Sequence, residues 1–170
     1  VYDGAAVPLQ REAYHAEFFH GPDGMGSMYY PAPKRPAETE HAVPALIRLI
    51  EENPGVILVT LGPMTNVALA VSQPPHIVKN VSRCGVMGGT ACQVGNITPA
   101  AEFNIWCDPE AASICFRSGL PIEMVGWELC RGDANLVEDE MRYYKEEIDT
   151  QLSHFTIDCN ASVLKANRDW

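Results

Sequence analysis

The fold is decided by the stretch Val56-Ile57-Leu58-Val59-Thr60-Leu61-Gly62-Pro63-Met64-Thr65-Asn66. Its first five residues form a short apolar run, which is typical of a parallel strand covered on both faces. Gly62-Pro63 then turns the chain, and Thr65 is placed to cap a helix over residues 66–71. A strand, a turn and a helix in this order predict one unit of a layered α/β fold.

The alternation of helix and strand continues on both sides of this stretch. Before it, apolar residues at helical spacing predict an amphipathic helix that ends near Asn53: Val43, Leu46, Ile47 and Ile50. After it, apolar runs predict strands over residues 84–87 and 122–126, separated by a helix over residues 108–117. We therefore expect an α/β fold with an open, mostly parallel sheet flanked by helices.

The two ends of the chain carry a weaker pattern. Residues 1–36 are rich in glycine, proline and aromatic residues, and they predict a long, ordered surface loop after a short strand. Residues 137–165 are charged and helical, with one break expected. We expect residues 1–170 to form a single domain.

The composition excludes several classes of partner. The chain has 170 residues, of which 46% are hydrophobic and 20% are charged, as in globular proteins. Its net charge of −10 argues against a nucleic-acid partner. No apolar run approaches the roughly 20 residues that span a bilayer, so no membrane partner is expected. Six cysteines without a Cys-x-x-Cys pair favour reduced, buried thiols and hence a cytoplasmic location.

Glycine-rich and polar segments follow the predicted strands, where the ligand crevice of an open parallel sheet lies. These segments are residues 61–66, 87–90 and 126–128. Gly88-Gly89 on its own would suit a nucleotide-binding turn, because neither residue has a Cβ that blocks a ligand. No Lys or Arg lies beside these glycines, which weakens that interpretation, and a plain tight turn is the simpler alternative.

The densest polar cluster contains Glu102 and Asn104. In an extended segment these two side chains point the same way, and Phe103 and Ile105 face the core. A carboxylate beside a carboxamide suits the hydroxyls of a sugar, and Asn96 would reach the same ligand. An exposed edge strand with solvated polar residues is equally consistent with this spacing.

The dipeptide Asp108-Pro109 marks the start of the following helix. Aspartate is a preferred N-cap, and proline suits the first helical position because its missing N–H is not needed there. We therefore assign both residues a structural role rather than a catalytic one.

Three motifs occur in the same order as in nucleoside hydrolases of the inosine–uridine-preferring superfamily, which this chain resembles. They are Leu-Gly-Pro-Met-Thr-Asn at 61–66, Met-Gly-Gly at 87–89, and Ala-Glu-Phe-Asn-x-x-x-Asp-Pro-Glu-Ala-Ala at 101–112. The segment that begins His20-Gly21 is also similar to that family. The resemblance implies a nucleosidase of purine and pyrimidine salvage. Such an enzyme cleaves the N-glycosidic bond of ribonucleosides with a calcium-bound water, giving ribose and free base.

The resemblance also implies roles for individual residues. Three of them would hold the ribose hydroxyls: Asn96, Glu102 and Asn104. Met87 would line the sugar side of the pocket, and Leu61 would give its main-chain carbonyl to the Ca²⁺ ion. His20 would lie near the nucleobase, although on its own it is better interpreted as a hydrogen-bonded loop histidine. Trp106 and Trp127 are candidates for stacking on the base, with packing as the safer interpretation.

Two features of the family are missing from these 170 residues. The sequence has no Asp-rich strand end and no His-Asp dipeptide, so the catalytic aspartate and most calcium ligands are expected outside this chain. We therefore expect a fold that is incomplete at both ends and an activity that requires further sequence. A non-catalytic ribose- or nucleoside-binding or interaction module is the alternative. Relatives in this family commonly associate, which makes a homo-oligomer an expected partner state.

Overall fold

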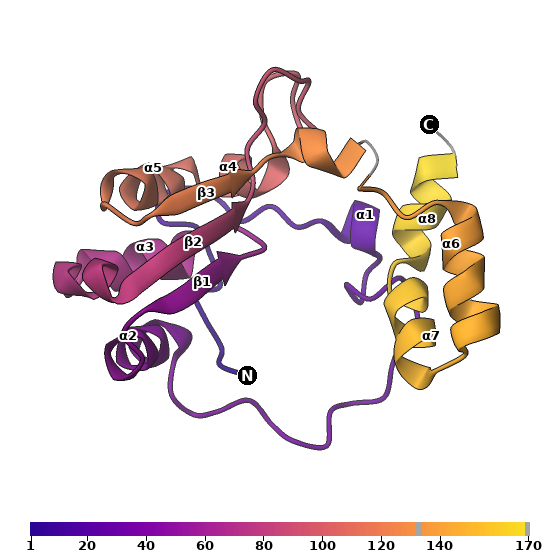
Figure 1. The fold of residues 1–170 in the computed structure, drawn as a ribbon, viewed down its shortest axis with the longest axis horizontal. Coiled ribbons are helices and arrows are strands. Elements are labelled where there is room, and N and C mark those ends of the chain that lie inside the picture. The colour runs from indigo at the N-terminus through magenta and orange to yellow at the C-terminus, as the bar shows by residue number, and fades with distance from the viewer. Residues whose placement is uncertain (132–133, 169–170) are drawn as a thin grey trace. The chain divides into compact units, whose positions relative to one another are not determined.

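The structure, a computed structural model, describes residues 1–131 and 134–168 (Figure 1). They fall into two compact units. The first unit combines Val1–Ala13 with Pro36–Ala134, and the second combines Tyr14–Arg35 with Asn135–Trp170. The single domain over residues 1–170 stays a prediction. In the described part of the chain, no helix has both the length and the apolar character needed to cross a membrane.

A parallel sheet lies at the centre of the first unit. Its strands are hydrogen-bonded in the order β1 (Val56–Thr60), β2 (Val81–Met87) and β3 (Ile122–Val125). Cys84 of β2 lies opposite Leu58 on one side and opposite Ile122 on the other. All three strands coincide with predicted apolar runs, although β2 begins before Cys84. The predicted α/β class with a parallel sheet is confirmed.

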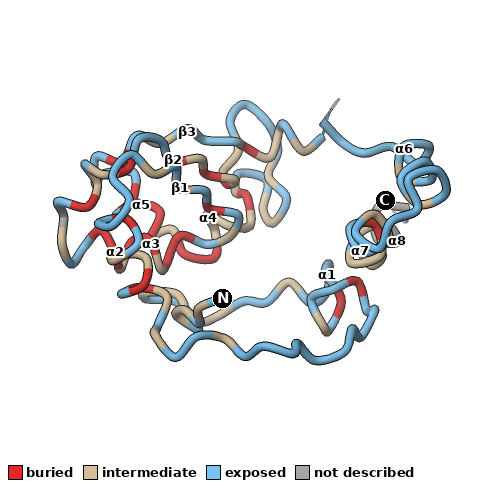
Figure 2. Tube along the Cα trace, turned by 60° about the horizontal axis from the view of Figure 1, so that its bottom comes forward, coloured by how far each residue is buried: buried red, intermediate tan, exposed pale blue. Residues whose placement is uncertain are grey.

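Helices cover one face of this sheet. They are α2 (Ala42–Glu52), α3 (Thr65–Ser72) and α5 (Pro109–Arg117), with a 3-10 helix, η1 (Pro75–Asn80), before β2. Their apolar sides form one hydrophobic core with the inward residues of the strands. Figure 2 shows the buried residues of this unit gathered along α2, α3, α5 and the strands.

The opposite face of the sheet is exposed. On β1, Ile57 and Val59 keep 59% and 60% of their surface accessible. Beside them, Arg83 of β2 forms an exposed ion pair with Glu123 of β3. The apolar run of β1 predicted cover on both faces, and within residues 1–131 and 134–168 that prediction is wrong for these positions.

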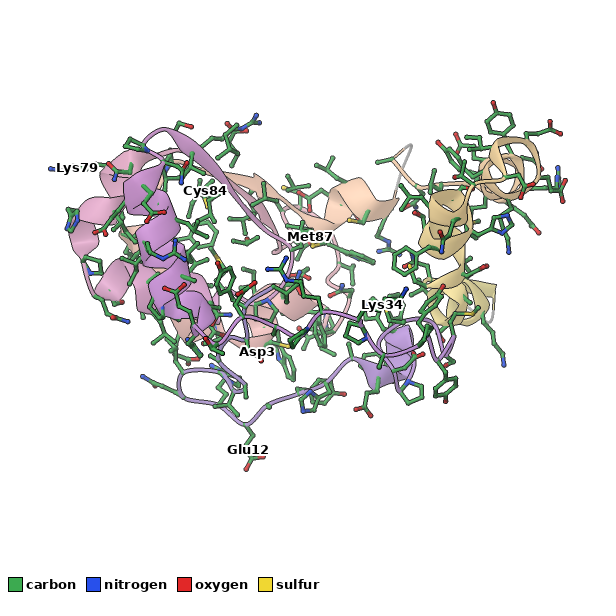
Figure 3. All side chains as sticks on the ribbon, turned by 90° about the horizontal axis from the view of Figure 1, so that it is seen from below. Asp3, Glu12, Lys34, Lys79, Cys84 and Met87 are labelled. Atoms are coloured by element: carbon green, nitrogen blue, oxygen red, sulfur yellow. The ribbon has the colours of Figure 1, made fainter. Side chains whose placement is uncertain are left out.

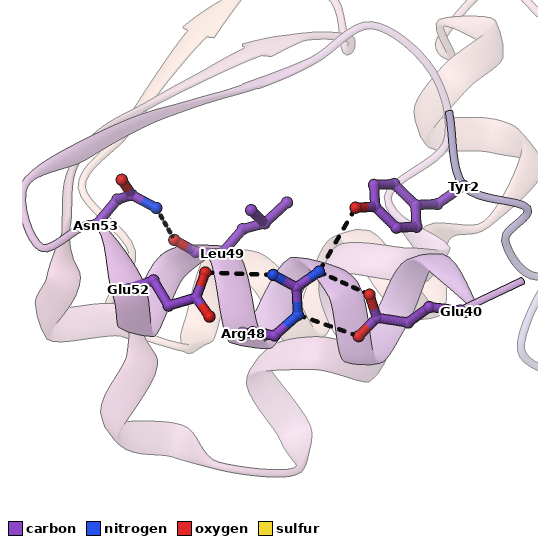
Figure 4. Close-up of polar contacts among 6 residues, drawn as sticks. All are labelled: Tyr2, Glu40, Arg48, Leu49, Glu52 and Asn53. Carbon is purple, nitrogen blue, oxygen red and sulfur yellow. Dashed lines mark hydrogen bonds and ion pairs between the residues drawn. The ribbon is translucent and has the colours of Figure 1, made fainter. Parts of the chain in front are cut away.

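The guanidinium of Arg48 on α2 forms hydrogen bonds with Tyr2, near the start of the chain, and with Glu40 (Figure 4). Arg48 donates to both carboxylate oxygens of Glu40, at 2.6 and 3.3 Å, and to Glu52 at 3.2 Å. It also donates to the hydroxyl of Tyr2 at 3.5 Å. The hydrogen bond to Arg48 lowers the pKa of Glu40. Because these side chains are partly exposed, the cluster fixes the direction of the segment more than it stabilises the fold.

The six cysteines all lie in the described residues and are free thiols. Cys84, Cys107 and Cys115 are buried, and burial raises the pKa of each, to about 12 for Cys115. Cys92 is exposed. The expectation of buried, reduced thiols therefore holds for the three core cysteines, which pack as small apolar groups.

The first unit also contains α4 (Phe103–Cys107) and the 3-10 helix η2 (Trp127–Arg131), and the second unit is helical. The helices of the second unit are α1 (Glu17–His20), α6 (Glu138–Tyr143), the π-helical turn η3 (Tyr144–Ile148), α7 (Gln151–Asp158) and α8 (Ala161–Arg168). The charged tail is interrupted twice rather than once, first at Asp149, which has a left-handed backbone, and again between α7 and α8. In place of the predicted N-terminal strand, Tyr2 forms only an isolated bridge with Glu38.

The loop after α1 is folded around the carboxylate of Asp23. Its two oxygens accept hydrogen bonds from Tyr29 N at 2.7 Å and from Met25 N and Ser27 N at 2.9 Å. A Cβ on Gly26 would lie 2.6 Å from the carbonyl oxygen of Asp158, so the loop packs directly on the end of α7. The predicted ordered loop is therefore present, and backbone-to-carboxylate bonds hold it.

Because one face of the sheet is covered and the other exposed, we expect Val→Ala substitutions on the two faces to change the free energy of unfolding by different amounts. Val86→Ala removes a fully buried side chain and should lower the free energy of unfolding by about 2 kcal/mol. Val59→Ala, on the exposed face of the neighbouring strand, should change it by only about 0.5 kcal/mol. Urea unfolding of both variants measures the difference. Equal losses would contradict the assignment of the covered face.

The Asp23 loop predicts a pH dependence. The backbone N–H groups, that of Tyr29 foremost, lower the pKa of Asp23 from its ordinary 3.8. The bonds therefore stabilise the loop above this value and are lost as the pH falls through the lower, folded pKa. The amide signals of Met25, Ser27 and Tyr29 should titrate together by NMR with a midpoint below 3.8, and Asp23→Asn should abolish that titration. A midpoint at or above 3.8 would contradict the loop geometry.

Candidate functional site

The candidate site begins at the carboxyl ends of β1 and β2. Thr60 pairs with Val86, so the next residues along the two strands, Leu61 and Met87, continue the same register. Met87 is the last residue of β2 (Figure 3). The side chain of Leu61 is 77% exposed. The first two predicted site residues therefore lie on neighbouring strand ends.

A short helix, α4 (Phe103–Cys107), carries the polar cluster. The sequence predicted an extended segment here, and that prediction is wrong. Glu102 is instead the N-cap of α4, and its carboxylate accepts hydrogen bonds from Asn104 N at 2.9 Å and Ile105 N at 3.1 Å. Asn96 accepts a third bond, from Phe103 N at 2.7 Å. Capping of the first turn brings Asn96, Glu102 and Asn104 together, where the prediction relied on strand alternation.

Glu102 is also tied to the turn after β2. Its side chain is only 2% exposed, and its Oε2 accepts a further bond from Gly89 N at 2.8 Å. A Cβ on Gly88 would lie 3.3 Å from Ile105 and 3.4 Å from this carboxylate. The two glycines therefore leave room for Glu102. A carboxylate has about four lone-pair sites, so the three bonds from the described residues leave one acceptor site, on Oε1.

The amide of Asn104 connects α4 to β2. Its Nδ2 donates to Met87 O at 3.1 Å and approaches Met87 Sδ at 3.2 Å. With Nδ2 engaged in this way, the amide orientation is fixed, and Oδ1 accepts no hydrogen bond from the part of the chain that the structure describes. Glu102 and Asn104 thus offer acceptors in one place, next to Met87.

Three further candidates have aromatic or imidazole side chains. Trp127 follows β3 and is half-buried, and its backbone N–H donates to Gly89 O at 2.9 Å. Whether its indole packs or stacks on a base stays a prediction. Trp106 is also half-buried, within α4. His20 ends α1 in the second unit, where its carbonyl accepts from Gly26 N at 2.9 Å. Its proposed place near a nucleobase stays a prediction.

The buried carboxylate of Asp108 has more partners than the predicted capping role requires. Asp108 caps α5 as predicted, accepting from Ala111 N at 3.0 Å, with Pro109 in the first turn. Its other oxygen accepts from Thr65 Oγ1 at 2.6 Å and from Leu9 N at 3.0 Å. Thr65 is therefore the first residue of α3 and not its cap, so that part of the prediction is wrong. No local pattern signals a partner 43 residues away.

The residues present do not by themselves fit a calcium ion. Ca²⁺ takes 6–8 oxygen ligands, several of them carboxylates in most sites. Across residues 1–131 and 134–168, no three His, Cys, Asp or Glu side chains are grouped as a metal site would require. The oxygens of Glu102 are largely used by backbone N–H groups. Leu61 O would supply one ligand, and the others would have to come from elsewhere.

The fold and the cluster define an α/β protein with a group of polar side chains at the carboxyl ends of its parallel strands. The chain belongs to the family of inosine-uridine preferring nucleoside hydrolases, whose family model matches residues 1–169. This match confirms the resemblance found in the sequence.

Individual relatives agree with this assignment. The chain is 40% identical to a probable uridine nucleosidase 1 of Oryza sativa subsp. japonica over 144 residues, 81% of this chain and 44% of that protein. It is also 40% identical to a pyrimidine-specific ribonucleoside hydrolase RihA of Citrobacter koseri, over 84% of this chain and 46% of that one. A solved plant nucleoside hydrolase matches with a TM-score of 0.92 and 31% identity, over 99% of this chain and 54% of that chain. The chain thus spans about half the length of the relatives it matches.

The capping role of Glu102 predicts a large effect on stability. Glu102→Ala should leave three backbone N–H groups without their acceptor and lower the free energy of unfolding by about 2–4 kcal/mol. The matched control is Glu123→Ala, which removes an exposed ion pair and should cost less than about 1 kcal/mol. Denaturant unfolding of the two variants makes the comparison. Similar costs would show that Glu102 is not held as described.

Proposed function

We propose that the protein containing this chain hydrolyses the N-glycosidic bond of ribonucleosides, releasing ribose and the free base. The observation that carries the proposal is the buried carboxylate of Glu102 with one remaining acceptor site beside the amide of Asn104. Membership of the nucleoside hydrolase family supports it.

In this reaction the bond from the anomeric carbon to the base nitrogen breaks as water adds to that carbon. Positive charge develops on the sugar in an oxocarbenium-like transition state, and contacts to the ring hydroxyls strengthen as it forms. Glu102 accepts a ribose hydroxyl at Oε1, and its negative charge stabilises the developing cation. Asn104 and Asn96 bind further hydroxyls, and Met87 lines the sugar. Because backbone N–H groups fix the Glu102 carboxylate, it needs no reorganisation during the reaction.

Other parts of the proposal lie outside this cluster. His20 contacts the nucleobase, and the aspartate that removes the proton from water belongs to sequence outside these residues. Leu61 O is one ligand of the calcium ion that the resemblance implies, and no step of the reaction is assigned to an ion on this chain. We also propose a cytoplasmic location, from the reduced thiols, and a homo-oligomer.

The test is base release from uridine and inosine by the complete gene product that contains residues 1–170. Glu102→Gln keeps the shape of the side chain but removes the charge, and kcat/KM should fall by roughly 100-fold or more. Glu123→Gln, in the exposed ion pair with Arg83 and outside the proposed site residues, is the control and should keep full activity.

Two results would contradict the proposal in different ways. Absence of base release from both nucleosides would exclude the hydrolase. Calorimetric binding of ribose or nucleosides without turnover would instead support the non-catalytic binding module.

A further inference from the structure

We propose that the buried hydrogen bond between Thr65 and Asp108 positions the two sides of the candidate site, Leu61 and Asn104, relative to each other. Asp108 is thereby a positioning residue, acting through Asn104 on one side and through Leu61 on the other. This inference rests on the proposed function, because it specifies how the same site is held in a reactive geometry.

Asp108 lies where the ribose-binding helix ends. It follows α4 directly as its C-cap and is at the same time the N-cap of α5, so its backbone is four residues from Asn104. The side chain is 0% exposed. Any shift of the Asp108 carboxylate is therefore passed along a short, hydrogen-bonded segment to the amide that contacts Met87.

Thr65 occupies the corresponding place on the other side of the site. It is the first residue of α3 and lies four residues after Leu61. The residue between the turn and the helix, Met64, is only 1% exposed and packs in the core. The segment from Leu61 to Met64 connects Thr65 to the end of β1. Because Met64 is tightly packed, a displacement of Thr65 is passed on to the end of β1.

The two carboxylate oxygens of Asp108 have different partners, and this difference distinguishes a positioning role from simple helix capping. The cap uses Oδ1 alone, through Ala111 N at 3.0 Å. Oδ2 is given to remote partners, Thr65 Oγ1 at 2.6 Å and Leu9 N at 3.0 Å. A charged acceptor makes short, directional hydrogen bonds, and burial excludes water as a substitute partner. A cap alone would need neither the burial nor the distant partners.

The experiment compares three variants of the complete gene product with uridine as substrate. Thr65→Val removes the hydroxyl at nearly constant volume and should lower kcat/KM roughly 10- to 100-fold, mainly through kcat, because the reacting geometry is lost. Thr65→Ser keeps the hydroxyl and should stay within about threefold of the wild type. Val67→Ala, in the core on the same helix, is the control for lost stability and should keep kcat/KM when measured well below its unfolding temperature.

Amide hydrogen exchange supplies a readout that needs no activity. Thr65→Val should speed the exchange of Trp106 N, which bonds to Glu102 O within α4, by at least about tenfold more than Val67→Ala does. Failure of the wild type to release base would overturn the proposed function but leave this exchange comparison decisive. Equal exchange and equal kcat/KM in Thr65→Val and Val67→Ala would overturn the positioning role.

Discussion

The buried carboxylate of Glu102 is the interaction on which the rest of the candidate site depends. It accepts hydrogen bonds from the turn after β2 and from the first turn of α4, and so joins these two elements. Burying a charge is favourable only when its partners are in place. The end of β2, the turn at Gly88-Gly89 and helix α4 must therefore form together. Local unfolding of any one of them would remove the site.

The polar groups of the site hold its structure as well as a proposed ligand. Asn104 bonds to the end of β2 through its amide nitrogen, which leaves its oxygen for the proposed ligand, while Asn96 accepts a bond from the first turn of α4 with its oxygen. A ligand thus meets groups whose rotamers the protein has already selected, which reduces the entropy lost on binding. Because the same side chains hold the structure and the proposed ligand, most substitutions of Asn96, Glu102 or Asn104 should change stability and affinity together.

Local signals in the sequence were sufficient for much of the fold. The apolar runs predicted the three strands, and the spacing of Val43 to Ile50 predicted α2, because both depend on neighbours in the chain. The Asp108-Pro109 cap was predicted for the same reason. Helix α4 was not, because glutamate is not a favoured N-cap and its role depends on Gly89, which lies on another segment. The ribose-binding roles of Glu102 and Asn104 came from the pairing of a carboxylate with a carboxamide and from the family motif, and they stay predictions.

The second unit is built from two stretches of chain with residues 36–134 between them, and this has a consequence for biosynthesis. A polypeptide leaves the ribosome from its N-terminus, so the glycine-rich loop appears long before Asp158 and Cys159, against which Gly26 packs. Until then Tyr30 lacks its ring partner Phe155, whereas the three described strands, of which the last ends at Val125, have already been synthesised. Translation therefore allows these three strands to pair before the two stretches of the second unit can meet.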